Sequence, residues 1–420
     1  MSESISTTCV QGGYRPGDGE PRQIPIYQST TWKYDTSEHM GRLFDLEEAG
    51  YFYTRLANPT NDFVAAKIAE LEGGTAAMLT SSGQAANFFA VFNIAGAGDH
   101  VVASSAIYGG TYNLLAVTMK RMGLECTFVS PDCTDEELEA AFRPNTKAVF
   151  GETIANPALA VLDIERFAAA AHARVLIVTT RSPRCVPPHR VGCRHRDALH
   201  QKYGRPWRPW AGPSWIREVR LDGAADKFPG LCEPDESYHG VTYTERFGLG
   251  GAFITKATAQ LMRDFGAIQS PQNAYLVNLG LESLHLRMAQ HSKNGLALAQ
   301  HLATHPKIAW VRYPGLPGDD QYELAQKYLP NGASGVVSFG VAGGRAAAET
   351  FMANLKLAQI ATHVADARTC VLHPANATHR QMNDAELAAA GITPDLIRLS
   401  CGIEATEDLV ADIDQALAAV

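Results

Sequence analysis

The sequence predicts an α/β protein with a mostly parallel sheet, helices on both faces of the sheet, and a smaller α+β domain at the C-terminal end. Three observations support this fold class. From about residue 62, short apolar runs alternate with longer segments of helical periodicity. After Gly250 the pattern changes to long amphipathic helices, including one over 276–302. The chain has 420 residues, 46% of them hydrophobic, enough for two packed domains.

The expected elements follow from this pattern. Residues 1–60, rich in Gly, Pro, Thr and Tyr, predict an extended arm that crosses to a neighbouring subunit, and residues 61–305 predict the large domain. The C-terminal domain, 306–420, is expected to contain strands at 335–339 and 397–400. In the large domain, helices are expected at 62–72, 84–94, 111–122, 135–142 and 164–173, and strands at 76–80, 100–104, 125–129, 148–153 and 175–178.

Charge and composition exclude several classes of function. The net charge is −8 and the two signs are interspersed, so no basic surface is expected to hold nucleic acid or an anionic membrane. Eight cysteines without a C-x-x-C pair, after a polar start, predict a reducing, cytoplasmic setting. The longest apolar runs, such as 88–95, fall short of the roughly 20 residues that a membrane span requires.

A short polar turn, Ser81, Ser82, Gly83 and Gln84, separates an apolar strand from a helix. Such a turn aims backbone N–H groups outward from a helix N-terminus, which is a favourable phosphate site. The loops at 108–110 and 152–157 also follow predicted strands, and ligands of open α/β sheets bind at these strand ends. Any one of these loops could be an ordinary turn, but together they favour a phosphate-bearing ligand.

These residues resemble the cystathionine γ-synthase-like group of fold-type I pyridoxal phosphate enzymes. The resemblance covers roughly 9–175 and 226–420 and is closest to the O-acetylhomoserine sulfhydrylase (aminocarboxypropyltransferase) branch, which the stretch 228–240 resembles in particular. The motifs that carry it lie at 25–28, 53–55, 81–86, 108–111, 152–153, 228–230, 237–240, 373–375 and 398–400.

The resemblance implies the cofactor pyridoxal 5′-phosphate. Its phosphate would bind the backbone N–H groups of Gly83 and Gln84, together with Tyr53 and Arg55 of a second subunit. The chain would then form a homo-oligomer with shared active sites, which requires at least a dimer and leaves a dimer and a homotetramer as alternatives. Tyr108 would stack on the pyridine ring, and the resemblance gives Tyr53 and Tyr108 catalytic as well as binding roles. No metal is implied.

The resemblance also implies how the substrate binds. Arg398 would hold the substrate α-carboxylate through two parallel hydrogen bonds. Asn156 would bond near the cofactor's phenolic oxygen, although a turn before Pro157 is the simpler interpretation of that residue. The implied reaction is γ-replacement on O-acetyl-L-homoserine by sulfide or a small thiol, which gives homocysteine. A cystathionine γ-synthase or γ-lyase-type enzyme, or a catalytically inactive protein of this fold, are the alternatives.

One segment departs from the family. Residues 181–220 contain nine arginines, six prolines and three of the five tryptophans, and no regular structure is expected over 176–224. Thr179 stands where the family has the Asp that pairs with the pyridine nitrogen. We interpret the segment as out-of-frame translation that begins near Thr179 and ends before Ala225. Another reading frame of the DNA should then encode an Asp-Asn-Thr motif.

The same segment should supply the lysine that carries the cofactor. Lys202, within His200-Gln201-Lys202-Tyr203, resembles the family's Ser-x-Thr-Lys-Tyr and is the candidate. Lys227 and Lys256 are weaker alternatives. Because Thr179 carries no charge, the electron sink should weaken by on the order of 100 to 1,000-fold in rate, which predicts an impaired enzyme.

Overall fold

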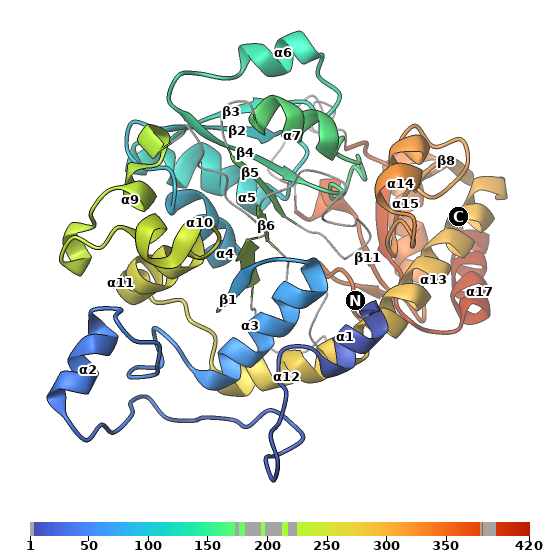
Figure 1. Ribbon diagram of the computed structural model, residues 1–420. Coiled ribbons are helices and arrows are strands. Elements are labelled where there is room, and N and C mark those ends of the chain that lie inside the picture. Colours follow the sequence, from blue (N-terminus) through green and yellow to red (C-terminus); the bar gives the residue numbers. More distant parts are fainter. Residues whose placement is uncertain are drawn as a thin grey trace. The chain divides into compact units, whose positions relative to one another are not determined.

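The computed structural model describes residues 4–172, 176–180, 195–197, 212–216, 225–378, 380 and 392–420 (Figure 1). Two compact units divide the chain. Unit 1 contains Met1–Thr153 and Asp163–Glu282, and unit 2 contains Ile154–Leu162 and Ser283–Val420. The sequence placed the boundary between 305 and 306. In the structure, the helix Leu284–Thr304, which ends just before residue 306, belongs to unit 2. The domain limits expected from the sequence stay a prediction.

Unit 1 is built on a seven-stranded sheet of order β1-β7-β6-β5-β4-β2-β3. The pairs β2–β3, β2–β4, β4–β5 and β5–β6 are parallel, whereas β7 is antiparallel to β1 and β6. Every residue of β2 is buried, as expected for a central strand covered on both faces. The strands are β1 (Ala76–Thr80), β2 (His100–Ser104), β3 (Glu125–Val129), β4 (Thr146–Glu152), β5 (Leu176–Thr180), β6 (His195–Asp197) and β7 (Gly212–Ile216).

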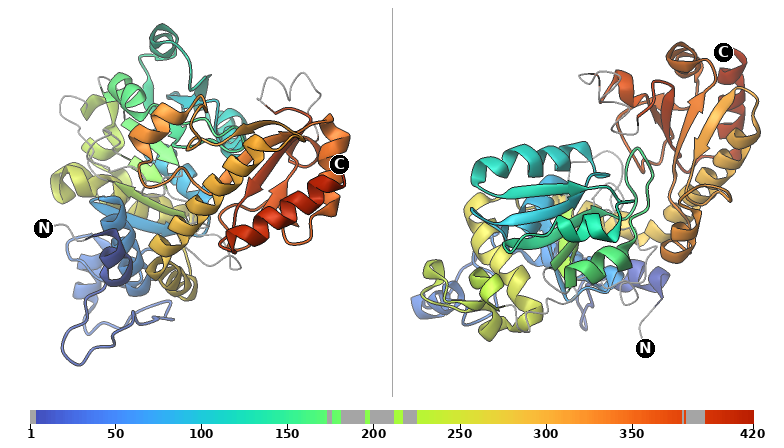
Figure 2. Two further views of the ribbon diagram at one scale, coloured as in Figure 1. Left: turned by 90° about the vertical axis from the view of Figure 1, so that its right-hand side faces the viewer. Right: turned by 90° about the horizontal axis from the view of Figure 1, so that it is seen from above.

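Helices flank this sheet on both sides (Figure 2). Phe89 of α4, Phe150 of β4 and Phe253 of α10 are among the residues of its core. The helices of unit 1 are α1 (Ile5–Gln11), α2 (Ser37–Phe44), α3 (Pro59–Glu72), α4 (Gly83–Phe92), α5 (Gly109–Asn113), α6 (Asp135–Ala140), α7 (Ile164–His172), α9 (Pro229–Cys232), α10 (Tyr243–Lys256), α11 (Arg263–Phe265) and α12 (Pro271–Glu282). The expected α/β fold with a mostly parallel sheet is confirmed.

Three expectations for unit 1 need correction. The expected arm contains two short helices, α1 and α2, which begin after the side-chain caps Ser4 and Thr36. The expected helix 111–122 changes after α5 into a π-helical turn, Leu114–Thr118, and a 3₁₀ turn, Lys120–Met122. The strand expected at 175–178 is present as β5, but the rest of 176–224, expected to be irregular, also contains the strands β6 and β7, because backbone pairing does not require an apolar side-chain pattern.

Unit 2 contains a five-stranded sheet of order β10-β11-β12-β9-β8, antiparallel except for the pair β10–β11. Its strands are β8 (Ile308–Arg312), β9 (Val336–Val341), β10 (Gln359–Ile360), β11 (Cys370–Leu372) and β12 (Leu396–Ser400). Its helices are α13 (Leu284–Thr304), α14 (Tyr322–Tyr328), α15 (Gly344–Asn354) and α17 (Thr406–Ala418). The smaller C-terminal α+β domain is therefore confirmed in its architecture.

The long helix expected over 276–302 is wrong in one respect. The chain forms two helices, α12 and α13, that are separated at Ser283, whose backbone angles are φ −106° and ψ 10°. The amphipathic pattern runs across this break, so periodicity alone did not reveal it. Within the described ranges, no helix combines the length and the apolar character that a membrane span requires.

Candidate active site

The turn after β1, where the sequence predicts a phosphate site, has the backbone geometry of a capped helix N-terminus. Ser82 has extended backbone angles and caps α4, since its Oγ accepts a hydrogen bond from the Ala85 N–H at 3.1 Å. Thr80 Oγ1 donates to the Ser82 carbonyl oxygen at 2.8 Å, which fixes the turn from the other side. Gly83 and Gln84 are the first two residues of α4, so their N–H groups have no acceptor inside the helix. The helix dipole adds positive potential at this point, and the site therefore suits an anion.

Tyr108 lies directly before α5 at the end of the loop that follows β2. Its backbone N–H donates to Glu152 Oε1 at 2.9 Å, which joins the ends of two neighbouring strands. Tyr108 is 45% exposed. The ring lies over Gly110, because a Cβ at that glycine would be 2.5 Å from Tyr108 Cε1. Gly110 thus makes room for the ring position that stacking on a cofactor would use.

Tyr53 and Arg55 lie together on an exposed segment before α3. The Arg55 guanidinium carbon is 5.0 Å from the centre of the Tyr53 ring, a cation–π contact that orients both side chains. Asn58 holds the segment, since its Nδ2 donates to the Tyr27 carbonyl at 2.9 Å and to Thr54 Oγ1 at 3.1 Å. The pair is thus held in place with its charge exposed, as a role in a neighbouring subunit's site would require.

Arg398 lies in unit 2 on the central strand β12, paired with Ser338 of β9 and Leu372 of β11. Its side chain is only 4% exposed. Nη2 donates to the His363 carbonyl at 2.8 Å, and Nη1 donates to Asn156 Oδ1 at 3.4 Å. These two contacts orient the guanidinium, whose planar donors can hold a carboxylate through two parallel hydrogen bonds.

This geometry brings together two predicted residues and adds contacts of His363 and Ser400, to which the sequence analysis assigned no individual role. Asn156 contacts Arg398. Its predicted hydrogen bond near the phenolic oxygen of the cofactor stays a prediction. His363 contributes its carbonyl oxygen, which has no sequence signature. Ser400 Oγ accepts from the Ala365 N–H at 3.0 Å and so fixes the loop that carries His363. Strand alternation could have revealed Ser400, because residues two apart on a strand share a face.

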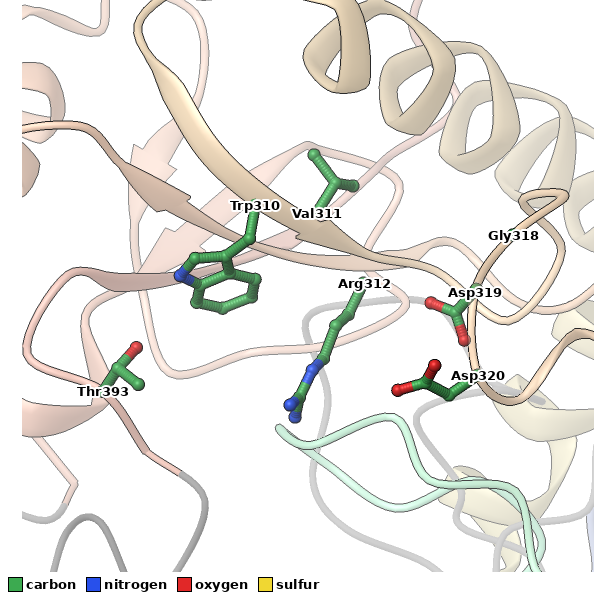
Figure 3. Close-up of a pocket in the computed structure, with 7 residues that line it drawn as sticks. All are labelled: Trp310, Val311, Arg312, Gly318, Asp319, Asp320 and Thr393. Carbon is green, nitrogen blue, oxygen red and sulfur yellow. The ribbon is translucent and has the colours of Figure 1, made fainter.

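A hollow of about 360 Å³ in unit 2 contains none of these residues (Figure 3). Its polar groups are largely committed to the fold. Trp310 Nε1 donates to Asp395 Oδ2 at 2.9 Å, and Asp319 accepts the N–H groups of Tyr313 and Gln321 at 2.8 and 2.9 Å. We therefore assign no ligand to it. Its lining residues are Trp310, Val311, Arg312, Gly318, Asp319, Asp320 and Thr393.

Comparison with known proteins identifies the family. The model of the Cys/Met metabolism PLP-dependent enzymes matches residues 6–188 and 248–418 of this chain. The chain belongs to this family. The predicted cofactor, pyridoxal 5′-phosphate, is thereby confirmed for the chain, and so is its place among enzymes of the transferase type.

Individual relatives support the same placement. The chain is 40% identical to the O-acetyl-L-homoserine sulfhydrylase of Leptospira meyeri over 98% of this chain and 96% of that protein. It is 40% identical to the O-acetyl-L-homoserine sulfhydrylase 1 of Thermus thermophilus, over 99% of this chain and all of that protein. A crystal structure of an O-acetylhomoserine (thiol)-lyase from Campylobacter jejuni, which carries a pyridoxyl-lysine 5′-monophosphate, superposes with a TM-score of 0.93. That protein is 33% identical, with 99% of this chain and 100% of that chain covered.

Gly83 and Gln84, at the N-terminus of α4, fit the phosphate of the cofactor. The cofactor also needs a lysine that carries it. Lys202 lies outside the described residues. Lys227 is half-buried, and its carbonyl oxygen accepts a hydrogen bond from Lys147 Nζ. Lys256 Nζ donates to the Asn93 carbonyl at 2.8 Å, and burial lowers the pKa of its amine. The contact of Lys256 gives its amine a structural role, whereas the contact of Lys227 involves only its backbone. Lys202 stays the proposed carrier.

The backbone of Thr179 lies in β5 opposite Gly151 of β4, near the carboxyl end of the strand. The family match stops at residue 188 and resumes at 248, which overlaps the segment where the sequence departs from the family.

Proposed function

We propose that this chain catalyses pyridoxal phosphate-dependent γ-replacement on O-acetyl-L-homoserine by sulfide or a small thiol. With sulfide, the products are homocysteine and acetate. The names of the relatives at 40% identity over nearly the full chain support this choice of substrates. The observation that carries the proposal in the structure is the N-terminus of α4, which Ser82 caps and which suits the phosphate of the cofactor. Within unit 2, the buried Arg398 guanidinium by itself suits the α-carboxylate of an amino-acid substrate.

Each site has a defined task in this reaction. When bound, the cofactor supplies an electron sink that acidifies the substrate's Cα and Cβ protons. Gly83 and Gln84 hold the phosphate, and Tyr108 orients the ring from the end of β2. Arg398 holds the α-carboxylate and thereby orients the Cα–H bond. The amine of Lys202 would act as the general base that takes the Cα proton.

The first experiment combines a spectrum with an assay. Purified chain is loaded with pyridoxal phosphate, and the absorbance is recorded before and after borohydride. Acetate release is then measured with O-acetyl-L-homoserine and sulfide. We expect a yellow protein whose cofactor becomes fixed to one lysine, and K202A should lose this fixation while K227A retains it. Fixation in K202A at the wild-type level overturns the assignment of Lys202.

The choice of nucleophile separates the proposed reaction from its alternatives. Cysteine in place of sulfide tests a cystathionine γ-synthase, and release of 2-oxobutanoate from cystathionine tests a γ-lyase. Faster turnover with either than with sulfide contradicts the sulfhydrylase assignment. The stretch that resembled the sulfhydrylase branch forms a locked loop, in which Tyr243 Oη donates to Asp235 Oδ2 at 2.8 Å and Tyr238 Oη to the Ala259 carbonyl at 2.7 Å.

Reduced activity is part of the proposal. Thr179 cannot supply the negative charge that keeps a pyridine nitrogen protonated, and loss of such a partner costs on the order of 100 to 1,000-fold in rate. The interruption of the family match between 188 and 248 supports the interpretation that this region is out of frame. T179D should raise turnover if only the charge is missing. Wild-type turnover typical of the family would refute the impairment.

We further propose a cytoplasmic homotetramer in which Tyr53 and Arg55 serve the partner's site. The exposed position of this pair and its fixation by Asn58 support the shared site. Mixing inactive R55A with inactive K202A subunits should restore one intact site per hybrid pair. Absence of any recovery in activity or cofactor fixation, with hybrids verified by mass, contradicts the shared site. Light scattering measures the subunit number.

A further inference from the structure

The side chain of Gln84 is held from two sides at the N-terminus of α4. Its Oε1 accepts a hydrogen bond from Asn87 Nδ2 at 3.1 Å and another from Thr111 Oγ1 at 3.0 Å. Asn87 Nδ2 also lies 2.9 Å from Thr111 Oγ1, which closes a three-membered network. Asn87 is 3% exposed and Thr111 is 1% exposed, whereas Gln84 is half-buried. Two buried groups therefore fix the orientation of one partly exposed amide.

This orientation has a chemical consequence. Because Oε1 is the atom that faces Asn87 and Thr111, the amide nitrogen Nε2 of Gln84 faces the other way with two donor hydrogens. Within the described part of the chain, Nε2 has no acceptor. It lies on the same residue as one of the two backbone N–H groups that begin α4. Neutral donors gathered at the positive end of a helix are complementary to an anion.

We propose that Asn87 and Thr111 are positioning residues that lock the Gln84 amide as an additional donor to the cofactor phosphate. The inference rests on the proposed function, since it assigns the α4 N-terminus to that phosphate. The same network reaches the ring site, because the Thr111 N–H donates to the Tyr108 carbonyl at 2.8 Å. Thr111 therefore connects the phosphate site with the residue proposed to stack on the cofactor ring.

The test uses ligands that cannot form a bond to any lysine. Pyridoxine 5′-phosphate carries the phosphate and the ring but no aldehyde, and pyridoxine lacks the phosphate. Dissociation constants of both are measured by calorimetry on the full chain and on three variants. T111V keeps the side-chain shape without the hydroxyl, T111S keeps the hydroxyl, and Q84M removes the amide at similar length.

We expect T111V and Q84M to bind pyridoxine 5′-phosphate about threefold to tenfold more weakly, the range for a lost neutral hydrogen bond. Pyridoxine should bind these variants as it binds the wild type, and T111S should match the wild type for both ligands. Unchanged phosphate-ester affinity in both T111V and Q84M overturns the inference, and so does an equal loss for the two ligands. If the wild-type chain binds pyridoxine 5′-phosphate no better than pyridoxine, the proposed function itself fails.

Discussion

Replacing Ser400 with alanine removes the hydroxyl that holds the loop beside Arg398. Ser400 Oγ, on a residue that is 1% exposed, accepts the Ala365 N–H at 3.0 Å. Ala365 has a φ of +58°, in the left-handed region that favours glycine. Two residues earlier, the His363 carbonyl accepts from Arg398 Nη2 at 2.8 Å. The Ser400 hydroxyl therefore fixes the position of the guanidinium through a strained loop.

The two free energies involved are of similar size. A left-handed alanine costs about 1–2 kcal/mol, and a buried N–H that loses its acceptor costs about 1–3 kcal/mol. Without the hydroxyl, the loop can lower its energy by leaving the left-handed conformation, and the His363 carbonyl would then move away from Arg398. We expect S400A to bind O-acetyl-L-homoserine about tenfold more weakly, which corresponds to about 1.4 kcal/mol. Calorimetric titration of the cofactor-loaded chain measures this even if turnover is slow.

A second substitution separates strain from general damage. Glycine at position 365 adopts a φ of +58° without steric cost, so the loop no longer needs the hydroxyl to hold it. The double variant S400A/A365G should recover affinity to within about threefold of the wild type. If S400A binds the substrate as well as the wild type, or if the double variant is no better than S400A, the reasoning about the strained loop is refuted.

Three further predictions concern the fold around the two sites. G110A should weaken pyridoxine 5′-phosphate binding about threefold to tenfold by displacing the Tyr108 ring, whereas G109A, whose Cβ meets no atom within 4 Å, should not; equal affinities contradict this. G402A places a Cβ 2.4 Å from a backbone oxygen and should lower the unfolding free energy by about 1–3 kcal/mol in urea titrations; an unchanged midpoint refutes it. Burial lowers the pKa of His100 from 6.5 to about 4. Between these two pH values, the unfolded chain therefore binds more protons than the folded chain. The unfolding free energy should fall by up to about 3 kcal/mol as the pH is lowered from 6.5 to 4. H100Q should lose that component, and an unchanged pH slope would contradict the assignment.

Sequence patterns predicted the limits of three strands of the larger sheet. The limits expected for β1, β2 and β3 agree with the structure, because short apolar runs between turn residues leave little choice of where a strand begins and ends. The break at Ser283 was not predictable, since the apolar periodicity continues across it. Strands β6 and β7 lie in an Arg- and Pro-rich segment whose composition argues against strands, and only their backbone pairing reveals them.

Some contacts of the candidate site could be predicted from the sequence, and others could not. The Ser82 cap and the free N–H groups behind it follow from local sequence, because a cap acts within one turn of the helix. The contact between Asn156 and Arg398 joins residues 242 positions apart, and no local rule connects them. The His363 carbonyl was equally hidden, because every residue has a carbonyl and only the fold selects which one meets a guanidinium.

Unit 2 includes a short segment that lies, in the sequence, between two parts of unit 1. Ile154–Leu162 belongs to unit 2, and it is tied there by Ser338 Oγ donating to the Pro157 carbonyl and by the Val161 N–H donating to Gln321 Oε1, both at 2.8 Å. A ribosome completes this short loop long before it reaches residue 283. The loop is therefore synthesised before the sheet of unit 2 that it contacts. A C-terminal fragment that begins at residue 283 would lack Asn156, whose side chain contacts Arg398.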